Sequence, residues 1–139
     1  MKNVTLRIED ALYNEMSKNE NCSFNEQINA ALRKVAAIER ASLNELRGRF
    51  TTSEWSAIAD SLNGTWLQDE TFRYTHTALV AHMEDSDLYE GIGKKWNVDI
   101  KQLCEKIKQL SAAQMDALYI RVEKFWEHPE TDIDAWAQF

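Results

Sequence analysis

The N-terminal segment carries the side chains best suited to contact a polar ligand. Residues 3–8 alternate strictly between polar and apolar types. Successive side chains of a β-strand point to opposite faces, so this alternation predicts a strand with one polar and one apolar face. The polar face presents Asn3, Thr5 and Arg7, which can hydrogen-bond the edges of DNA bases, and an arginine can bridge two acceptors of guanine. The apolar face presents Val4, Leu6 and Ile8.

A single short strand needs a partner, because it cannot satisfy its own backbone groups or bury its apolar face. The same strand of a second copy is the simplest partner. A two-stranded antiparallel ribbon built in this way fits the major groove of B-DNA. The alternative is an ordinary edge strand, in which Arg7 forms a surface ion pair with an acid such as Glu9.

Two helical patterns follow this segment. Glu9 and Asp10 suit the start of a first helix, because acidic side chains are favourable near the positive end of a helix dipole. Ser23 and Glu26 have the spacing of a capping box and predict the start of a second helix. The second pattern has a helical apolar period and continues without Pro or Gly as far as Gly48, so we expect one long or nearly continuous helix. The apolar residues that recur with this period are Phe24, Ile28, Ala31, Leu32 and Val35.

The order of strand, short helix and capped longer helix over residues 2–36 resembles the ribbon-helix-helix family of DNA-binding proteins. The resemblance implies that Asn3, Thr5 and Arg7 read the bases from a ribbon shared by two chains. It implies that a DNA phosphate is held by Ser23, Phe24 and Asn25 at the start of the second helix, with Lys2 as a further phosphate contact. It also implies a dimer core formed by Val4, Leu6, Ile8, Leu12, Ile28 and Leu32.

The charge of the chain is divided unevenly between its two parts. The net charge is −7, which is unfavourable for a protein that binds nucleic acid. Residues 1–50 contain eight Lys or Arg and seven Asp or Glu, whereas residues 51–139 contain eight and sixteen. The acidity therefore belongs to the second part, which should face away from phosphates.

The second part has the pattern of an all-α domain. Capping boxes begin at Thr51 and Ser111, and Trp55, Trp96 and Trp126 occupy expected core positions, while Trp66 is ambiguous. Short links between amphipathic segments are typical of a helical bundle. The expected helices cover residues 51–62, 72–83, 86–95, 97–110, with Asn97 as the cap, and 111–128, which ends before Pro129.

No group of residues predicts catalysis or a cofactor. His76 and His82 are six positions apart, which does not match the i, i+4 spacing of a helical metal pair, and His128 is isolated. Cys22 and Cys104 are too far apart in sequence for a short metal-binding or redox motif. The acidic residues at 84, 85 and 87 lack the spacing of a calcium loop and are expected to be solvated. We expect no enzyme activity, no metal and no cofactor.

The last ten residues, 130–139, form an acidic segment with Ile133, Trp136 and Phe139 spaced along it. The segment could dock into a partner's groove or pack back on its own domain.

The chain is expected to consist of a DNA-binding and dimerisation domain (1–48), an acidic helical domain (49–129) and this tail (130–139). No segment has the length of a membrane span, so we expect a cytoplasmic protein.

The sequence thus predicts a mainly α protein with an N-terminal ribbon-helix-helix unit, one strand of which pairs in a dimer, followed by an all-α domain. Proteins similar to this family are small transcriptional repressors, many of them autoregulatory, including antitoxins. We expect double-stranded DNA and a second copy of the chain as partners, and two dimers could assemble on DNA. The helical domain could in addition bind another protein. The alternative is an acidic protein-interaction module or DNA mimic that uses the ribbon only to dimerise.

Overall fold

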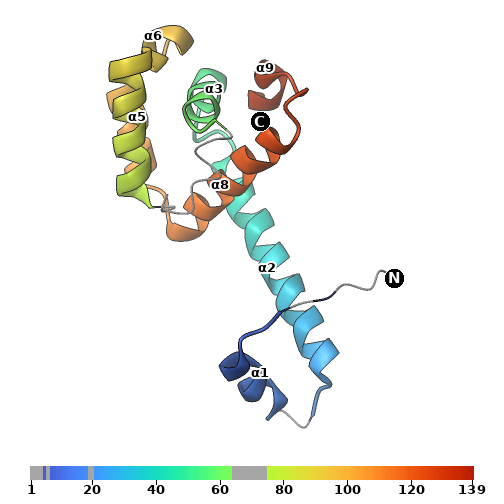
Figure 1. Ribbon diagram of the computed structural model, residues 1–139. Helices are drawn as coiled ribbons and strands as arrows, with labels where there is room; N and C mark the ends of the chain where they lie inside the picture. The colour runs from blue at the N-terminus through green and yellow to red at the C-terminus, as the bar shows by residue number, and fades with distance from the viewer. Residues whose placement is uncertain (1–4, 6, 19–20, 64–74) are drawn as a thin grey trace. The chain divides into compact units, whose positions relative to one another are not determined.

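Figure 1 shows the computed structural model of the protein, in which residues 5, 7–18, 21–63 and 75–139 are described. The chain forms two compact units, Met1–Ile38 and Glu39–Phe139. The division falls ten residues before the domain boundary expected at residue 48, and the tail belongs to the second unit. Each unit is described separately below.

The N-terminal unit contains helix α1 (Asp10–Ser17) and the first part of helix α2 (Phe24–Leu46). Glu9 has an extended backbone and precedes α1 as its N-cap residue. The two helices meet where the rings of Tyr13 and Phe24 lie 5.1 Å apart. The expected continuation of the second helix towards Gly48 is confirmed, since α2 runs to Leu46 and Gly48 has a positive φ of 74°.

The predicted β-strand is wrong for the residues that the structure describes. Thr5, Arg7 and Ile8 belong to no strand or helix, while Asn3, Val4 and Leu6 lie outside the described residues. A strand is defined by hydrogen bonds to a neighbouring extended segment, and the described part of the chain holds no such segment for residues 3–8. Alternation of side chains alone therefore did not specify a strand, although the mainly α class is confirmed.

The second unit is helical throughout its regular elements and includes the end of α2. Capping boxes begin α3 at Thr51 and α8 at Ser111, as the sequence predicts. Its further helices are α3 (Thr52–Ser61), α5 (His76–Glu90), α6 (Ile92–Trp96), α7 (Ile100–Lys108), α8 (Ala112–Glu127) and α9 (Ile133–Ala137).

The division of residues 72–95 into helices differs from the expectation. A single helix, α5, continues past Met83 to Glu90. Ser86 lies in the polar stretch after Met83 and is buried, so this stretch has an inner face that packs on the unit. The break comes at Gly91, whose φ of 67° suits glycine. Asn97, expected to cap the next helix, has a φ of 55° and ends α6, and the Asp99 side chain caps α7 instead. Trp66 and the start of the expected 72–83 helix lie outside the described residues.

Helix α3 lies at the centre of the second unit and is its most thoroughly buried element. It packs against α5, α6, α8 and α9, and α5 also packs along α7. The tail packs back on its own unit, since α9 lies against α3 and Ala137 is buried. The largest fully buried side chains are Leu46, Trp55, Ile58, Leu62, Leu79, Met83, Ile92, Leu103, Ile107, Met115, Leu118 and Val122.

Candidate nucleic-acid interface

The N-terminal segment presents free polar side chains where the structure describes it. Thr5 and Arg7 are both exposed. Arg7 forms no ion pair with Glu9 or with any other described residue, so its guanidinium is available to a ligand. Asn3 and Lys2, expected to contact a base and a phosphate, lie outside the described residues.

The start of α2 is organised by Ser23 and Glu26. The Ser23 hydroxyl accepts from the Glu26 amide at 3.2 Å, and the Glu26 carboxylate accepts from the Ser23 amide at 2.9 Å. This reciprocal pair confirms the predicted capping box. It also places a carboxylate at the helix end where Ser23, Phe24 and Asn25 were expected to hold a phosphate, which works against an anion there.

Phe24 and Asn25 face different surroundings. Asn25 is exposed, while Phe24 is half-buried against Tyr13. The amides of the first helical residues have no intrahelical acceptor, so the two residues still offer main-chain donors at this end. Phe24 contributes mainly by fixing α1 to α2.

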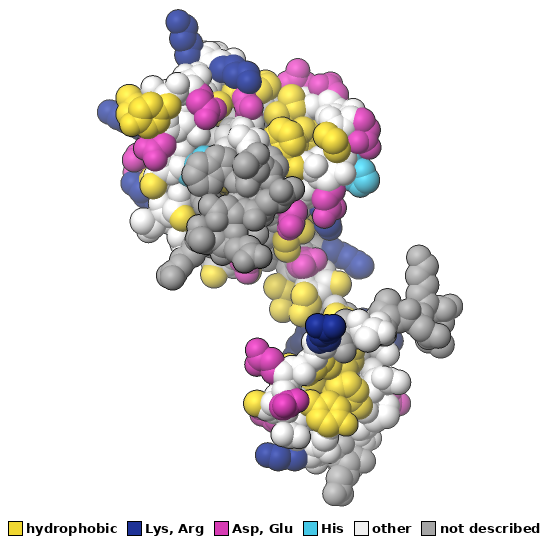
Figure 2. Space-filling view, viewed as in Figure 1, with side chains coloured by type: hydrophobic (Ala, Val, Ile, Leu, Met, Phe, Trp, Pro, Cys, Tyr) yellow, Lys and Arg dark blue, Asp and Glu magenta, His cyan; other side chains and the backbone are white. Residues whose placement is uncertain are grey.

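A stripe of large apolar side chains lies exposed on the N-terminal unit, and we call it the apolar stripe. Its members are between 50% and 54% exposed. No described residue of the Met1–Ile38 unit is buried, so the described part of this unit forms no core of its own. Figure 2 shows hydrophobic side chains gathered on one face of α1 and α2. The stripe consists of Leu12, Tyr13, Leu32, Val35 and Ile38.

The residues expected in the dimer core are distributed unevenly in the single chain. Leu12 and Leu32 are in the apolar stripe, while Ile8 and Ile28 are half-buried. Val4 and Leu6 lie outside the described residues. The structure thus leaves Leu12 and Leu32 about half exposed within the described chain.

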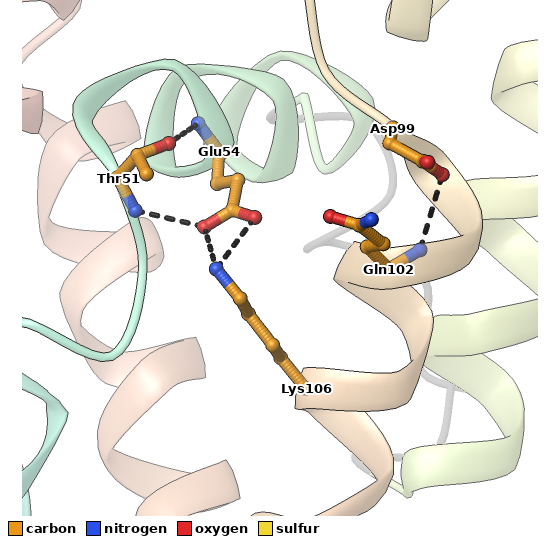
Figure 3. A network of polar contacts seen from close by, with 5 residues as sticks. All are labelled: Thr51, Glu54, Asp99, Gln102 and Lys106. Atoms are coloured by element: carbon orange, nitrogen blue, oxygen red, sulfur yellow. Dashed lines mark hydrogen bonds and ion pairs between the residues drawn. The ribbon is translucent and has the colours of Figure 1, made fainter.

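The second unit holds a buried carboxylate and a half-buried guanidinium that the sequence analysis did not single out as sites. Glu54, at the start of α3, accepts from Lys106 of α7 at 2.8 Å through both carboxylate oxygens (Figure 3). Arg121 of α8 is held among aromatic rings from α3 and the tail. A signal for Arg121 was present in the sequence, because it occupies a helical position between the apolar residues Leu118 and Phe125.

His76, His82 and Cys104 are engaged in packing within the second unit. His76 and His82 direct Nε2 to the carbonyl oxygens of Leu110 and Ser61, each at 2.5 Å. Cys104 is buried, and burial raises the pKa of its thiol to about 11, which disfavours the reactive thiolate. The described residues contain no group of three or more His, Cys, Asp or Glu side chains that could hold a metal ion.

The acidic run on α5 is solvated for the most part. Glu84 and Asp85 are exposed, whereas Asp87 accepts a hydrogen bond from the Gly93 amide at 3.0 Å and so joins α5 to α6. A shallow hollow of about 380 Å³ lies beside Glu84, between His76 and Lys108. Its wall combines Glu84 with the basic side chains of His76 and Lys108, with Thr77 and with small apolar side chains, and this mixture defines no particular ligand.

Comparison of the sequence with models of known protein families finds no match, and comparisons with curated proteins and with solved structures find none either. Within the described residues, no helix has both the length and the apolar character needed to cross a membrane. The function of the protein must therefore be inferred from its own residues.

Proposed function

We propose that the protein is a homodimeric, sequence-specific DNA-binding regulator that acts as a transcriptional repressor in the cytoplasm. The residues that contact bases are Asn3, Thr5 and Arg7. The observation that carries the proposal is an N-terminal unit with an exposed Arg7 that pairs with no described residue, and with a large apolar stripe but no described buried residue. The resemblance of residues 2–36 to a DNA-binding family supports it through the order of the two helices, although the described part of residues 3–8 forms no strand.

The apolar stripe supports a dimer. Chain lengths below about 40 residues rarely stabilise a fold without disulfides, metals or association with another chain. The Met1–Ile38 unit is of this size and keeps Leu12, Leu32 and Val35 half exposed. A second copy brings an identical stripe to the same surface, and a two-fold axis then buries both. We assign the missing core to this contact.

The charge distribution sets the expected strength of DNA binding. The Met1–Ile38 unit has five basic and five acidic residues, and the Glu39–Phe139 unit has eleven and eighteen. Binding to nucleic acid gains most of its affinity from neutralised phosphates. We therefore expect modest affinity for a single dimer, a strong dependence on salt, and an increase when dimers bind adjacent sites.

Replacing Arg7 with Ala should abolish selection of a DNA sequence. The guanidinium can bridge the O6 and N7 acceptors of guanine, a contact that contributes about 1–3 kcal/mol of discrimination. The measurement is enrichment of bound duplexes from a random pool, with wild type, Arg7→Ala and Arg49→Ala compared. Arg49 is an exposed arginine of the other unit and serves as the control.

A short motif should emerge with wild type and Arg49→Ala and be lost with Arg7→Ala, while thermal unfolding stays the same in all. If the wild-type protein is folded and dimeric but enriches no motif, the proposed function is wrong.

Replacing Leu32 with Asp should convert the dimer to a monomer. Leu32 is 53% exposed in the single chain, so the charge costs little there, but the dimer would have to bury it. Sedimentation velocity measures the change. Ala30→Asp adds the same charge to an exposed position on the opposite face of α2 and should leave the dimer intact. A dimer that survives Leu32→Asp would show that the apolar stripe is not the interface.

A second function is an acidic protein-interaction module or DNA mimic. The surface of α5 favours it, because Leu88 and Tyr89 are 74% and 80% exposed beside the acidic residues at 85, 87 and 90. Under this alternative, Arg7→Ala has no effect on the biological activity, and the protein competes with DNA for a basic partner instead of binding DNA.

A further inference from the structure

The Arg121 side chain stands among three aromatic rings of the second unit. Its guanidinium carbon lies 3.9 Å from the ring centroid of Trp136, 4.1 Å from that of Phe139 and 4.4 Å from that of Trp55. Trp136 and Phe139 belong to the tail, while Trp55 belongs to α3. A cation over an aromatic face is stabilised by the ring's negative charge density, so Arg121 joins the tail to the body of the unit.

The hydrogen bonding of Arg121 is incomplete. Its Nη2 donates to the main-chain carbonyl of Trp136 at 2.5 Å, whereas the buried Nη1 has no hydrogen-bond partner among the described residues. A guanidinium carries five N–H donors that match a carboxylate in a two-bond fork. Here one neutral carbonyl occupies the place of that carboxylate.

No acid compensates the charge of Arg121 within the described residues. Neither Asp132 nor Asp134 of the tail forms an ion pair with it. The charged group that lowers its pKa by repulsion is another cation, Arg47, whose guanidinium carbon lies 5.0 Å from the Phe139 ring centroid. Burial, and then repulsion by Arg47, lower the pKa of Arg121 to about 10, so it stays charged at neutral pH.

The tail is joined to the rest of the second unit by an exposed segment. Residues 127–132, which lead into α9, are all exposed, and α9 has five residues. The tail is held by Ala137, which is buried, and by the rings of Trp136 and Phe139 on Trp55, at 5.8 Å and 5.7 Å. Lifting the tail would uncover Trp55, Phe125 and Arg121 together, because the Trp136 ring also covers Phe125.

We propose that the surface formed by Trp55, Phe125 and Arg121 is a docking site for a protein segment that carries an aromatic side chain next to a carboxylate, and that this segment displaces residues 133–139. The tail demonstrates that an aromatic segment fits the surface. The uncompensated Arg121 and the neighbouring Arg47 make the surface complementary to a carboxylate, which the tail does not supply.

Competition with the tail sets the expected affinities. A tethered segment competes at an effective concentration on the order of millimolar, so an external segment binds the wild-type chain weakly. A change that weakens the tail should strengthen binding of the external segment. This reversal distinguishes a shared site from binding elsewhere, and it does not involve DNA, so it is independent of the proposed function.

The experiment uses the full chain and a fluorescent peptide with the sequence of residues 130–139 and a free terminal carboxylate. Anisotropy titrations compare wild type with Trp136→Ala and, as a second way of loosening the tail, Ala137→Asp. Both variants should bind the peptide about tenfold or more tightly than wild type does. Adding Arg121→Ala to either variant should remove binding, whereas adding Arg49→Ala should not. Far-UV circular dichroism verifies that each variant keeps its helices.

Two further comparisons identify the occupant. The same peptide with Ala135→Asp, which places a carboxylate next to the aromatic side chain, should bind Trp136→Ala at least about tenfold more tightly than the unchanged peptide, because a charged acceptor on a guanidinium is stronger than a neutral one. Equal binding by the two peptides would overturn the carboxylate assignment. Equal affinity of wild type and both loosened variants would overturn the docking site. Self-association that depends on Arg121 would assign the site to the tail of a second copy and overturn the assignment to another protein.

Discussion

Replacing Trp55 with Ala should lower the free energy of unfolding of the Glu39–Phe139 unit by about 3–5 kcal/mol. Trp55 is 1% exposed, and its ring contacts the Phe50 ring at 5.2 Å, both tail rings and the Arg121 guanidinium. The variant leaves a cavity at the place where α3, α8 and α9 meet. It also removes one of the three rings that hold Arg121, so the tail should loosen together with the core.

Urea unfolding followed by far-UV circular dichroism measures the loss. Tyr89→Ala is the matched control, because Tyr89 is 80% exposed and its removal should change the free energy by less than about 0.5 kcal/mol. Trp55→Phe should cost less than Trp55→Ala, because the buried Trp55 Nε1 has no hydrogen-bond partner among the described residues. A loss below about 1 kcal/mol for Trp55→Ala would show that the tail cluster is not part of the cooperative core.

Local chemistry was predictable from the sequence. The capping boxes that begin at Ser23, Thr51 and Ser111 form as expected, because each depends on two side chains three residues apart and on their own backbone. The long α2 was predictable for the same reason, since no residue between Phe24 and Leu46 interrupts a helix. The packing of Trp55 was likewise evident from the apolar face of its helix.

Contacts between distant parts of the chain were not predictable in this way. The expected strand at residues 3–8 failed because alternation does not supply the backbone neighbour that a strand requires. Lys106 and Glu54 are 52 residues apart, and Arg121 and Trp136 are 15 apart, so no periodic pattern connects them. The helix end expected after Met83 was misplaced. The helix continues through the polar stretch because Ser86 is buried, and it ends where Gly91 adopts the left-handed conformation.

The candidate interface was predictable in composition but not in geometry. The sequence identified Arg7, Leu12 and Leu32, and the structure leaves all three exposed. It could not show that the described N-terminal unit lacks buried residues, because burial depends on what surrounds each side chain. It also could not show that Glu26 places its carboxylate at the start of α2, where a phosphate was expected.

Replacing Lys106 with Met should destabilise the second unit by about 2–3 kcal/mol, because it leaves the Glu54 carboxylate buried without its cation. The Glu54 side chain is 9% exposed and would keep a single strong donor, the Thr51 amide at 2.8 Å (Figure 3). The loss should be smaller than for a fully buried pair, since the Lys106 side chain is 39% exposed and water can partly replace it.

The matched control on the same helix is Lys108→Met. Lys108 pairs with Glu105 at 2.7 Å, but both side chains are more than half exposed, so this variant should unfold at the same urea concentration as wild type. In the double variant Glu54→Gln, Lys106→Met, most of the stability should return, because glutamine keeps the acceptor of the capping box without the buried charge. Equal effects of Lys106→Met and Lys108→Met would show that the Glu54 carboxylate is solvated in solution. A double variant no more stable than Lys106→Met alone would show that the stem of Lys106 stabilises α7 by packing and not by its charge.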